Sequence, residues 1–428
     1  MRIRIGPTIV VCLASAVVAL VAVSGCARLG GDGVTLVASA RPKKADAGTP
    51  RSERLVAAIN DFGVDLLMAT SDGAGENVVV SPASVHAALS MTANGAAGET
   101  AAEMHRVLRI ESMGTTASNA DWASLLAQLD SRSSKQVLEV ANGLWARDGV
   151  EFKEPFLAAD RDFFGAQVTT LDFEKDDVKG EINRWVKKET HGMIGRVVEE
   201  VPAESILYLV NAVYFLGEWV EPFESESTYD APFTRADGSQ VDAAMMHSTR
   251  WMPYARTDVL QATKLPYQGD DSAYYILLPD EGVQFGDAAA SLQGTGFSEL
   301  RRTLMSQDGT EVALGLPKLD TECLTELAEP LSALGMPHAF DDAEADFTGM
   351  ADLDVPIYIG SVLHKTKVKV DEKGTEAAAV TVSAMMTGSA APGNEPIQFV
   401  CDRPYLFAIV DEGSGAMLFL GAVNDPTK

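Results

Sequence analysis

Residues 368–405, VKVDEKGTEAAAVTVSAMMTGSAAPGNEPIQFVCDRPY, decide the fold of this chain. The stretch begins like a strand, because Val368 and Val370 alternate with lysines. It ends at the start of a second apolar run, residues 405–410. Between the two runs lies a long segment with almost no large apolar residue and no turn signal before Gly388. A compact domain seldom keeps so long a plain loop unless the loop is functional.

This loop has the composition of a strand. Apart from Glu376, residues 375–383 are small or β-branched and include no proline, so they could join a sheet without blocking its hydrogen bonds. One face of such a strand would carry side chains small enough for a tightly packed core, namely Thr375, Ala377, Ala379, Thr381 and Ser383. The other face could meet solvent or a covering helix, and it would carry Glu376, Ala378, Val380, Val382 and Ala384. The segment therefore lies where a loop is expected, between two strands, but its side chains alternate as they do in a strand.

Residues 373–381, KGTEAAAVT, resemble the hinge of the reactive-centre loop of the serpin family, and residues 402–407, DRPYLF, resemble the strand beyond that loop. The resemblance implies a reactive-centre loop over about residues 372–396. Its hinge would consist of Gly374, Thr375, Glu376, Ala377, Ala378, Ala379, Val380 and Thr381. In this family the cut loop joins the main sheet as a new strand, which is an established case of strand addition. From composition alone, an alanine-rich linker or helix is the alternative.

Other segments resemble serpin motifs in the expected order. Residues 55–66 have the apolar spacing of an amphipathic helix, and residues 77–84 (NVVVSPAS) predict a buried strand that passes into a helix capped by Ser81. Further matches are residues 88–108, 142–145, 182–194, 209–219, 316–319 and 418–426. Residues 182–194 would form the helix that crosses the main sheet and the exit from that helix. The resemblance covers about residues 51–428, and it implies one α+β domain with the serpin fold, three β-sheets, about eight or nine helices and an exposed reactive-centre loop.

The resemblance also assigns two polar groups to the main sheet. A "shutter" under its centre would consist of Ser81, Ser84, Asn211 and His364. A buried hydrogen-bonded cluster of this kind can hold two strands together and exchange partners when a third strand is inserted. A "breach" at the top of the sheet, where insertion begins, would consist of Trp219, Lys318 and Glu372. The residues alone also allow plainer roles, with the two serines as helix caps and His364 as an ordinary core histidine.

No motif marks an enzyme. The chain lacks GxSxG, HExxH, a P-loop and a GxGxxG that opens a helix. With six histidines and no CxxC motif it has no signature of a metal site, redox centre or cofactor. A Ser–His–Asp set stays open, because its members need only meet in space. A disulfide between Cys323 and Cys401 is also open, although two separate buried thiols are favoured.

The N-terminus has the pattern of a targeting segment. Arg2 and Arg4 precede the apolar residues 9–23, a run shorter than the ~20 residues that a membrane span needs. Residues 23–26, VSGC, resemble the lipobox of bacterial lipoproteins. The resemblance implies a signal peptide over residues 1–25, lipidation of Cys26, a flexible tether over residues 26–50, and an extracytoplasmic protein anchored to the bacterial cell envelope. An uncleaved anchor and an ordinary secretory signal are the alternatives.

The charge of the chain limits its partners. The formal net charge is −27, and loss of the signal peptide with its two arginines makes it about −29. So acidic a surface argues against nucleic acid, anionic lipid and heparin-like activators as partners. We expect a monomer whose partners are a protease and, through the anchor, a membrane.

The resemblance implies suicide inhibition of a protease. While both of its ends are tethered, the segment from Thr375 to Thr387 cannot pair in the sheet. Once the bait bond is cut, these thirteen or so residues could form a strand roughly 40–45 Å long. New hydrogen bonds at ~1 kcal/mol each put the gain on the order of 10 kcal/mol. A gain of that size is comparable with the whole stability of a domain, so the uncut form would be kinetically trapped.

The bait residues indicate the class of protease. The register of the family places the cut bond at Gly388–Ser389, within a window of Met385, Met386, Thr387, Gly388, Ser389 and Ala390. No Lys or Arg lies between Lys373 and Arg403, which excludes trypsin-like targets. Methionine and small residues suit chymotrypsin-, elastase- or subtilisin-like serine proteases, and a papain-like cysteine protease stays open.

Two other classes of function compete with this prediction. The first is a non-inhibitory serpin that acts as a surface binding or chaperone-like protein, which the small side chains of the hinge disfavour. The second is an unrelated surface enzyme or solute-binding lipoprotein, which the ordered motifs disfavour.

Overall fold

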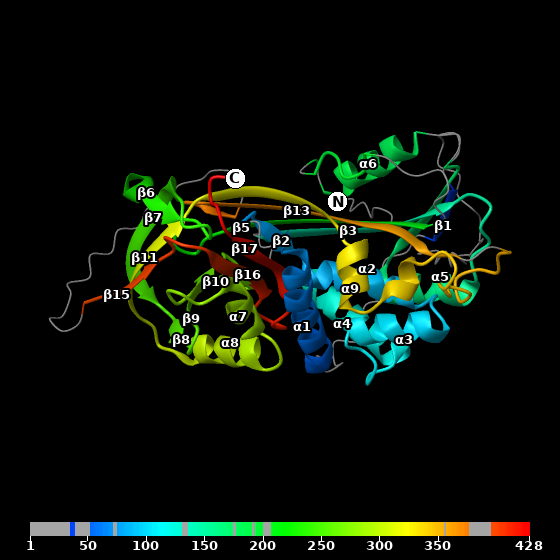
Figure 1. The fold of residues 1–428 in the computed structure, drawn as a ribbon, viewed down its shortest axis with the longest axis horizontal. Coiled ribbons are helices and arrows are strands. Elements are labelled where there is room, and N and C mark those ends of the chain that lie inside the picture. Colours follow the sequence, from blue (N-terminus) through cyan, green and yellow to red (C-terminus); the bar gives the residue numbers. More distant parts are fainter. Residues whose placement is uncertain are drawn as a thin grey trace, which may run out of the picture.

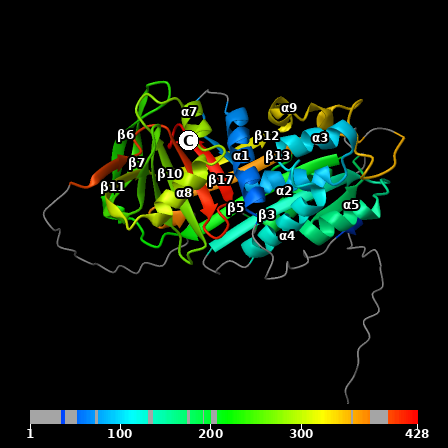
Figure 2. The ribbon, with the colours of Figure 1, turned by 90° about the horizontal axis from the view of Figure 1, so that it is seen from below.

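The computed structural model describes residues 52–71, 75–130, 136–173, 177–190, 192, 194–199, 207–354, 357–375 and 395–428, and the backbone of residues 35–38. The expected α+β fold with three β-sheets is confirmed. A long sheet, sheet A, runs along the molecule, with sheets B and C at one end and most of the helices at the other (Figures 1 and 2).

Sheet A has seven strands and carries the predicted site. In spatial order they are β1 (Thr35–Ala38), β4 (Gln167–Leu171), β3 (Gln136–Arg147), β5 (Leu207–Glu218), β14 (Gly374–Thr375), β13 (Ile359–Asp371) and β12 (Leu319–Glu326). Along β13 buried and half-buried residues alternate, and the buried set includes His364, Val368 and Val370. This period of two is the one that the sequence predicts for the start of the deciding stretch.

Sheets B and C supply the rest of the β-structure. Sheet B contains β2 (Val78–Val80), β17 (Met417–Val423), β16 (Tyr405–Asp411), β10 (Ser272–Pro279), β9 (Leu260–Pro266) and β8 (Tyr254–Arg256). Its strands β10, β16 and β17 are buried at every position, as their continuous apolar runs predict. Sheet C contains β15 (Ile397–Val400), β11 (Thr310–Pro317), β7 (Gln240–Met252) and β6 (Thr228–Thr234).

The described residues include nine α-helices and three short helical turns. The α-helices are α1 (Glu53–Thr70), α2 (Pro82–Ala93), α3 (Gly98–Val107), α4 (Thr115–Asp130), α5 (Glu154–Ala159), α6 (Val178–Glu189), α7 (Phe285–Ala290), α8 (Gly296–Ser306) and α9 (Ala328–Leu334). The short turns are η1 (Asp160–Phe164), η2 (Ser225–Ser227) and η3 (Pro337–Phe340). The predicted amphipathic helix is α1, whose Leu55, Ile59, Phe62 and Leu66 are all buried.

Helix α6 crosses sheet A on the face opposite to α1–α5, as expected for residues 182–194 (Figure 1). It has a small core of its own, separate from the main core. Ile182 and Val186 of α6 are fully buried there, together with Trp145 from β3 and Val210 from β5. A strand added between β5 and β13 would therefore lie close to this core.

Two expectations for individual segments need correction. Ser81 is the N-cap residue of α2, but its side chain does not bond to the helix, because its hydroxyl donates a hydrogen bond to the carbonyl oxygen of Leu418, 2.6 Å away. In the segment expected to be a plain tether, Thr35–Ala38 forms β1, which pairs antiparallel with β4 at the edge of sheet A. A strand in this segment covers an otherwise open sheet edge, and its backbone hydrogen bonds do not depend on apolar side chains.

Other sequence expectations concern the cysteines and the membrane. Cys323 and Cys401 are separate free thiols, as favoured from the sequence. Within the described ranges no helix has the length and apolar character to cross a membrane. The signal peptide and Cys26 lie outside the described residues.

Candidate functional site

The site lies where strands β5 and β13 of sheet A separate. The two strands pair in parallel from Ile359 and Leu207 to Lys367 and Tyr214. Above that point the short strand β14 lies between them. Thr375 of β14 pairs with Val370 of β13 on one side and with Gly217 of β5 on the other. The expectation that the loop cannot pair before it is cut is therefore wrong for Thr375, the first residue of the predicted inserting strand.

Thr375 is held in the sheet by a buried tyrosine. Its side chain is fully buried, and its hydroxyl lies 2.6 Å from the hydroxyl of Tyr267, which is also fully buried. Burial raises the pKa of Tyr267 well above its ordinary value, so the phenol stays neutral and can donate or accept a hydrogen bond. Tyr267 could not be identified from the sequence, because residues 264–268 (KLPYQ) match no motif.

Two glycines are required here, Gly374 for the close approach of β14 to β5 and Gly217 for the packing of Tyr267 against β5. A Cβ atom on Gly374 would lie 2.1 Å from the carbonyl oxygen of Gly217 and 2.8 Å from Cα of Glu218. A Cβ atom on Gly217 would in turn lie 2.8 Å from the ring of Tyr267. Both positions require glycine because any side chain there would meet backbone or a buried ring.

The three predicted breach residues come together around the turn before β14. Trp219 is buried, stacks on Tyr267 with ring centroids 4.6 Å apart, and donates from Nε1 to the carbonyl oxygen of Asp371 at 2.9 Å. The backbone N–H of Trp219 also donates to the carbonyl oxygen of Lys373 at 2.8 Å. Trp219 therefore holds both ends of the Asp371–Lys373 turn, one through its indole and the other through its backbone.

Lys318 and Glu372 form the predicted ion pair across this turn. Nζ of Lys318 lies 2.8 Å from Oε2 of Glu372. Partial burial raises the pKa of Glu372, but hydrogen bonds, the strongest of them from Lys318, outweigh burial and leave the pKa below its ordinary value. Because the lysine side chain is 39% exposed, such a pair contributes only about 0–1 kcal/mol, and its main effect is to fix the position of the turn.

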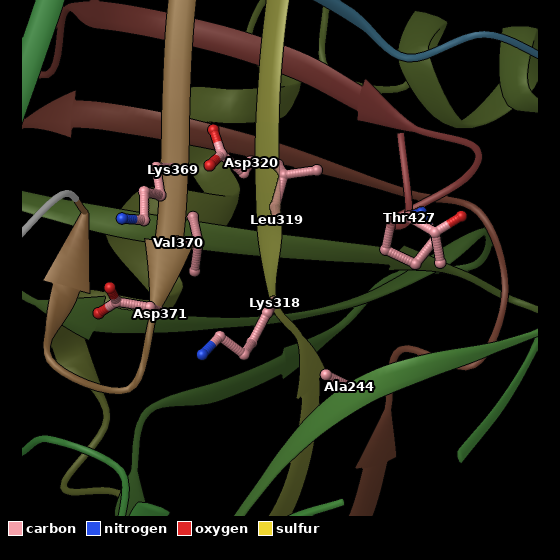
Figure 3. Close-up of a pocket in the computed structure, with 9 residues that line it drawn as sticks. Ala244, Lys318, Leu319, Asp320, Lys369, Val370, Asp371 and Thr427 are labelled. Carbon is pink, nitrogen blue, oxygen red and sulfur yellow. The ribbon is translucent and has the colours of Figure 1, made fainter. Parts of the chain in front are cut away.

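A pocket of about 290 Å³ lies next to the breach (Figure 3). It is bounded by residues of β12 and β13, by Ala244 of β7 and by the C-terminal Pro426 and Thr427. The formal charges of its lining sum to zero, because it has two lysines and two aspartates, Lys318, Lys369, Asp320 and Asp371. It lies toward β12, whereas β14 pairs with the other edge of β13, so the pocket is outside the gap. The parts of the chain that are described contain no cluster of residues that could hold a metal ion.

The four predicted shutter residues form one buried hydrogen-bonded cluster. His364 of β13 and Asn211 of β5 are register partners, and Nδ1 of His364 lies 2.7 Å from Oδ1 of Asn211. Nε2 of His364 accepts from the backbone N–H of Ser81 at 2.9 Å, so the proton must lie on Nδ1, which donates to Asn211. The amide nitrogen of Asn211 donates to the hydroxyl of Ser84. The cluster therefore links both strands of the parallel pair to the start of α2.

Burial keeps this cluster neutral. All four side chains are at most 2% exposed. Burial lowers the pKa of His364 to about 3, so the imidazole is uncharged at neutral pH. Thr366, which the sequence analysis did not select, extends the cluster by donating to the carbonyl oxygen of Val79 at 3.0 Å. It lies two residues after His364, on the same face of β13.

The described Ser–His contact does not resemble a catalytic one. Ser90 Oγ lies 3.2 Å from Nδ1 of His86, but both side chains belong to α2 and are buried in the protein interior. Nε2 of His86 lies 3.0 Å from the carbonyl oxygen of Leu108 rather than from a carboxylate. A substrate has no access to such a pair.

Most of the reactive-centre loop lies outside the described residues. This holds for the hinge from Glu376 to Thr381 and for the bait window Met385, Met386, Thr387, Gly388, Ser389 and Ala390. After the loop the chain forms β15, which pairs in parallel with β11 of sheet C from Ile397 to Val400. The structure thus places the two described ends of the loop, Thr375 and Ile397, in different sheets.

Comparisons with known proteins agree with this geometry. The family model described as Serpin (serine protease inhibitor) matches residues 57–426. The leukocyte elastase inhibitors of Bos taurus and Homo sapiens are 34% and 31% identical, over 87% of this chain and 100% of theirs. The crystal structure of the thermophilic serpin tengpin in its native state superposes with a TM-score of 0.82 and 30% identity, covering 91% of this chain and 97% of that one. The chain belongs to the serpin family.

Proposed function

We propose that this chain inhibits extracellular serine proteases by covalent trapping, followed by insertion of its cut loop into sheet A. The observation that carries the proposal is the position of β14. Gly374 and Thr375 already pair with β5 and β13, antiparallel to both, at the open end of the gap. The residues that follow Thr375 would extend this strand toward the shutter.

The chemistry would begin with the protease. Its serine hydroxyl attacks the carbonyl carbon of the bait bond, an ester forms, and the peptide bond breaks to release the amine of the following residue. The N-terminal part of the loop then carries the protease as an acyl group. Insertion that is faster than hydrolysis of this ester would move the protease away from the loop end at β15.

The shutter would be rearranged during insertion. Below Lys367 and Tyr214 the strands β5 and β13 are bonded directly to each other, so the new strand has to replace those bonds. The His364–Asn211 hydrogen bond spans the two strands and would be broken, while His364 keeps its bond from the N–H of Ser81. A neutral histidine can change partners in this way without leaving a charge buried.

The target would be a chymotrypsin-, elastase- or subtilisin-like protease. The absence of Lys and Arg between Lys373 and Arg403 supports this choice. So does the similarity to two proteins named leukocyte elastase inhibitor. A papain-like protease remains a secondary target class. The lipobox resemblance of residues 23–26 further supports a lipid anchor at Cys26 that places the inhibitor on the outer side of a bacterial membrane.

The test uses residues 27–428, which keep β1, incubated with chymotrypsin, pancreatic elastase and subtilisin. We expect a protease–inhibitor band that survives SDS, and a released peptide whose first residue identifies the cut bond. The control is the same protease with its active-site serine blocked, which should give no such band. The cut but uncomplexed chain should also unfold at a higher temperature than the intact chain.

Clean cleavage without a stable band and without a rise in unfolding temperature would contradict the proposal. The non-inhibitory surface binding protein would then be the better description.

A further inference from the structure

Three lysines of β13 lie on one face of sheet A, at every second position of the strand: Lys365, Lys367 and Lys369. The residues that alternate with them are buried against the main core, so the lysines lie on the opposite face, the one that α6 crosses (Figure 1). Since β13 forms one side of the gap into which the cut loop would insert, these lysines border that gap.

Only the first of the three lysines has a partner for its charge in the part of the chain that the structure describes. Nζ of Lys365 lies 2.6 Å from Oε1 of Glu322, which is the register partner of Lys367 on β12. Lys367 and Lys369 make no ion pair with any described residue, although Asp320 of β12 is the register partner of Lys369. In Figure 3 the side chain of Lys369 extends away from the strand that carries Asp320.

The register of β14 determines which loop residue would meet Lys369. Thr375 is buried and pairs with Val370 of β13. In an antiparallel pair the next residue of the inserted strand, Glu376, would lie opposite Lys369, with both side chains on the outer face. On the other side of the inserted strand its partner would be Leu216 of β5, which has no charge.

The composition of the loop fits this register. Glu376 is the only charged residue among residues 375–387, the segment expected to insert. The other side chains of its parity are apolar, namely Ala378, Val380, Val382 and Ala384. The single acid of the inserting segment would therefore lie opposite a lysine that has no other partner, and opposite charges directly across two strands attract each other.

The diagonal neighbours of Glu376 would also carry charge. They are Lys367 and Asp371 on β13 and Glu218 on β5. Diagonal pairs are farther apart than directly opposite pairs, and the carboxylate of Asp371 already accepts a hydrogen bond from the backbone N–H of Lys373. Lys369 would therefore supply the strongest electrostatic interaction of Glu376.

The same charges distinguish the correct register from its neighbours. A slip by one residue would turn Glu376 toward the core, where an unpaired carboxylate is costly. A slip by two residues out of the sheet would place Glu376 opposite Asp371, and like charges across a strand pair repel each other. A slip by two residues in the other direction would pull on the turn that Trp219 holds at both ends.

We propose that Lys369 is a positioning residue that receives Glu376 as the first new cross-strand pair after cleavage and thereby fixes the register of the inserting strand. The proposal rests on the loop insertion in the proposed function. The pair would form before the strand reaches the shutter, so it would favour insertion over hydrolysis of the ester.

The test uses residues 27–428 and the variants Lys369→Glu, Glu376→Lys and the double variant with both exchanges. The stoichiometry of inhibition is measured for each, together with the rise in unfolding temperature when the loop is cut. We expect each single variant to need about two-fold more inhibitor per protease molecule, with a smaller rise on cutting, and high salt to reduce both differences. The double variant restores the pair with its charges exchanged, so both values should return close to those of the original. Arg302→Glu, which changes an exposed cation of α8 outside sheet A, is the matched control and should alter neither value.

The results separate this inference from the proposed function. Single variants that match the original in both values would overturn the role of Lys369 and leave inhibition intact, as would a double variant that loses as much as the two single variants together. If the original chain is cut without forming a complex, the proposed inhibition fails, and the rise in unfolding temperature on cutting still decides whether the pair forms. If cutting the original chain gives no such rise, insertion and this inference are both overturned.

Discussion

His364 forms hydrogen bonds through both ring nitrogens, and each bond fixes a different part of the shutter. The backbone donor of Ser81 occupies Nε2, which leaves Nδ1 to donate to Asn211 across the parallel strand pair. A substitution that removed the ring would take one hydrogen-bond partner away from two buried groups, the N–H of Ser81 and the amide oxygen of Asn211. Each such group costs about 1–3 kcal/mol.

The first prediction concerns the acid sensitivity of this residue. Burial lowers the pKa of His364 to about 3, whereas the unfolded chain has the ordinary value of 6.5. The unfolded state therefore binds the extra proton, and stability is complete above about pH 6.5 and falls as the pH decreases toward 3, by up to about 1.4 kcal/mol per pH unit. Buried His86, with a pKa of about 4, acts in the same direction.

We expect His364→Asn to reduce the pH dependence of the urea-unfolding midpoint between pH 7 and 4.5, although the variant is less stable at every pH. His338→Asn is the control. That half-buried histidine has a pKa raised by its hydrogen bond to Glu103, so its removal should make the loss of stability in acid steeper. An unchanged slope in His364→Asn would contradict the assignment of a neutral buried imidazole.

The resemblance to serpin motifs named, residue by residue, two groups of side chains that the structure brings together, the cluster around His364 and the group around Trp219. Tyr267 and Thr366 were not predictable in this way. Each has its role through a neighbour far away in the chain, Thr375 for Tyr267 and Val79 for Thr366.

At the scale of elements, the two-residue strand β14 shows what the alternation of side chains can predict and what it cannot. The alternation of small side chains predicted that Thr375 faces a packed core, and its burial agrees. The period of two cannot show how far a strand extends before the loop is cut. That depends on the gap between β5 and β13 and on Gly374, which lets β14 approach β5. The strand β1 was missed for a similar reason, because edge pairing uses backbone groups that every sequence has.

The second prediction concerns the hinge element. Thr375→Arg should convert the inhibitor into a substrate, because a guanidinium cannot occupy a fully buried position beside Tyr267. Thr375→Val keeps the shape and loses only the hydroxyl, so it should retain most of the inhibition. Ala377→Arg, at the next position of the same parity, should behave like Thr375→Arg.

The measurement is the ratio of SDS-resistant complex to cleaved inhibitor for each variant. An unchanged yield of complex with Thr375→Arg would show that this side chain need not be buried for insertion.

At the scale of the whole molecule, the net charge and the proposed anchor act together. A protein of charge −27 is repelled by anionic lipid, so it has no electrostatic reason to lie on a membrane. The lipid anchor at Cys26 would supply that affinity, and β1 would join its tether to the edge of sheet A. The tether would then leave the domain next to β4, in a different part of sheet A from β14.

The third prediction concerns this anchor. When the complete chain is expressed in bacteria, the mature protein should fractionate with membranes and have a mass increased by acyl chains on Cys26. Cys26→Ala should lose that added mass and leave the detergent-extracted lipoprotein fraction. Cys12→Ala, within the signal peptide, is the control and should change neither property. Equal behaviour of the two variants would argue for an ordinary signal peptide or an uncleaved anchor.

The position of Thr375 between β5 and β13 also affects the rate of insertion. Starting a new strand is the slow part of strand addition, because chain entropy is lost before many hydrogen bonds are gained. In this molecule that nucleus exists before the protease arrives, since Gly374 and Thr375 are already bonded on both sides. Insertion after cleavage would then extend this existing strand one residue at a time. The outcome of the race against ester hydrolysis would then depend on how fast β5 and β13 part at the shutter.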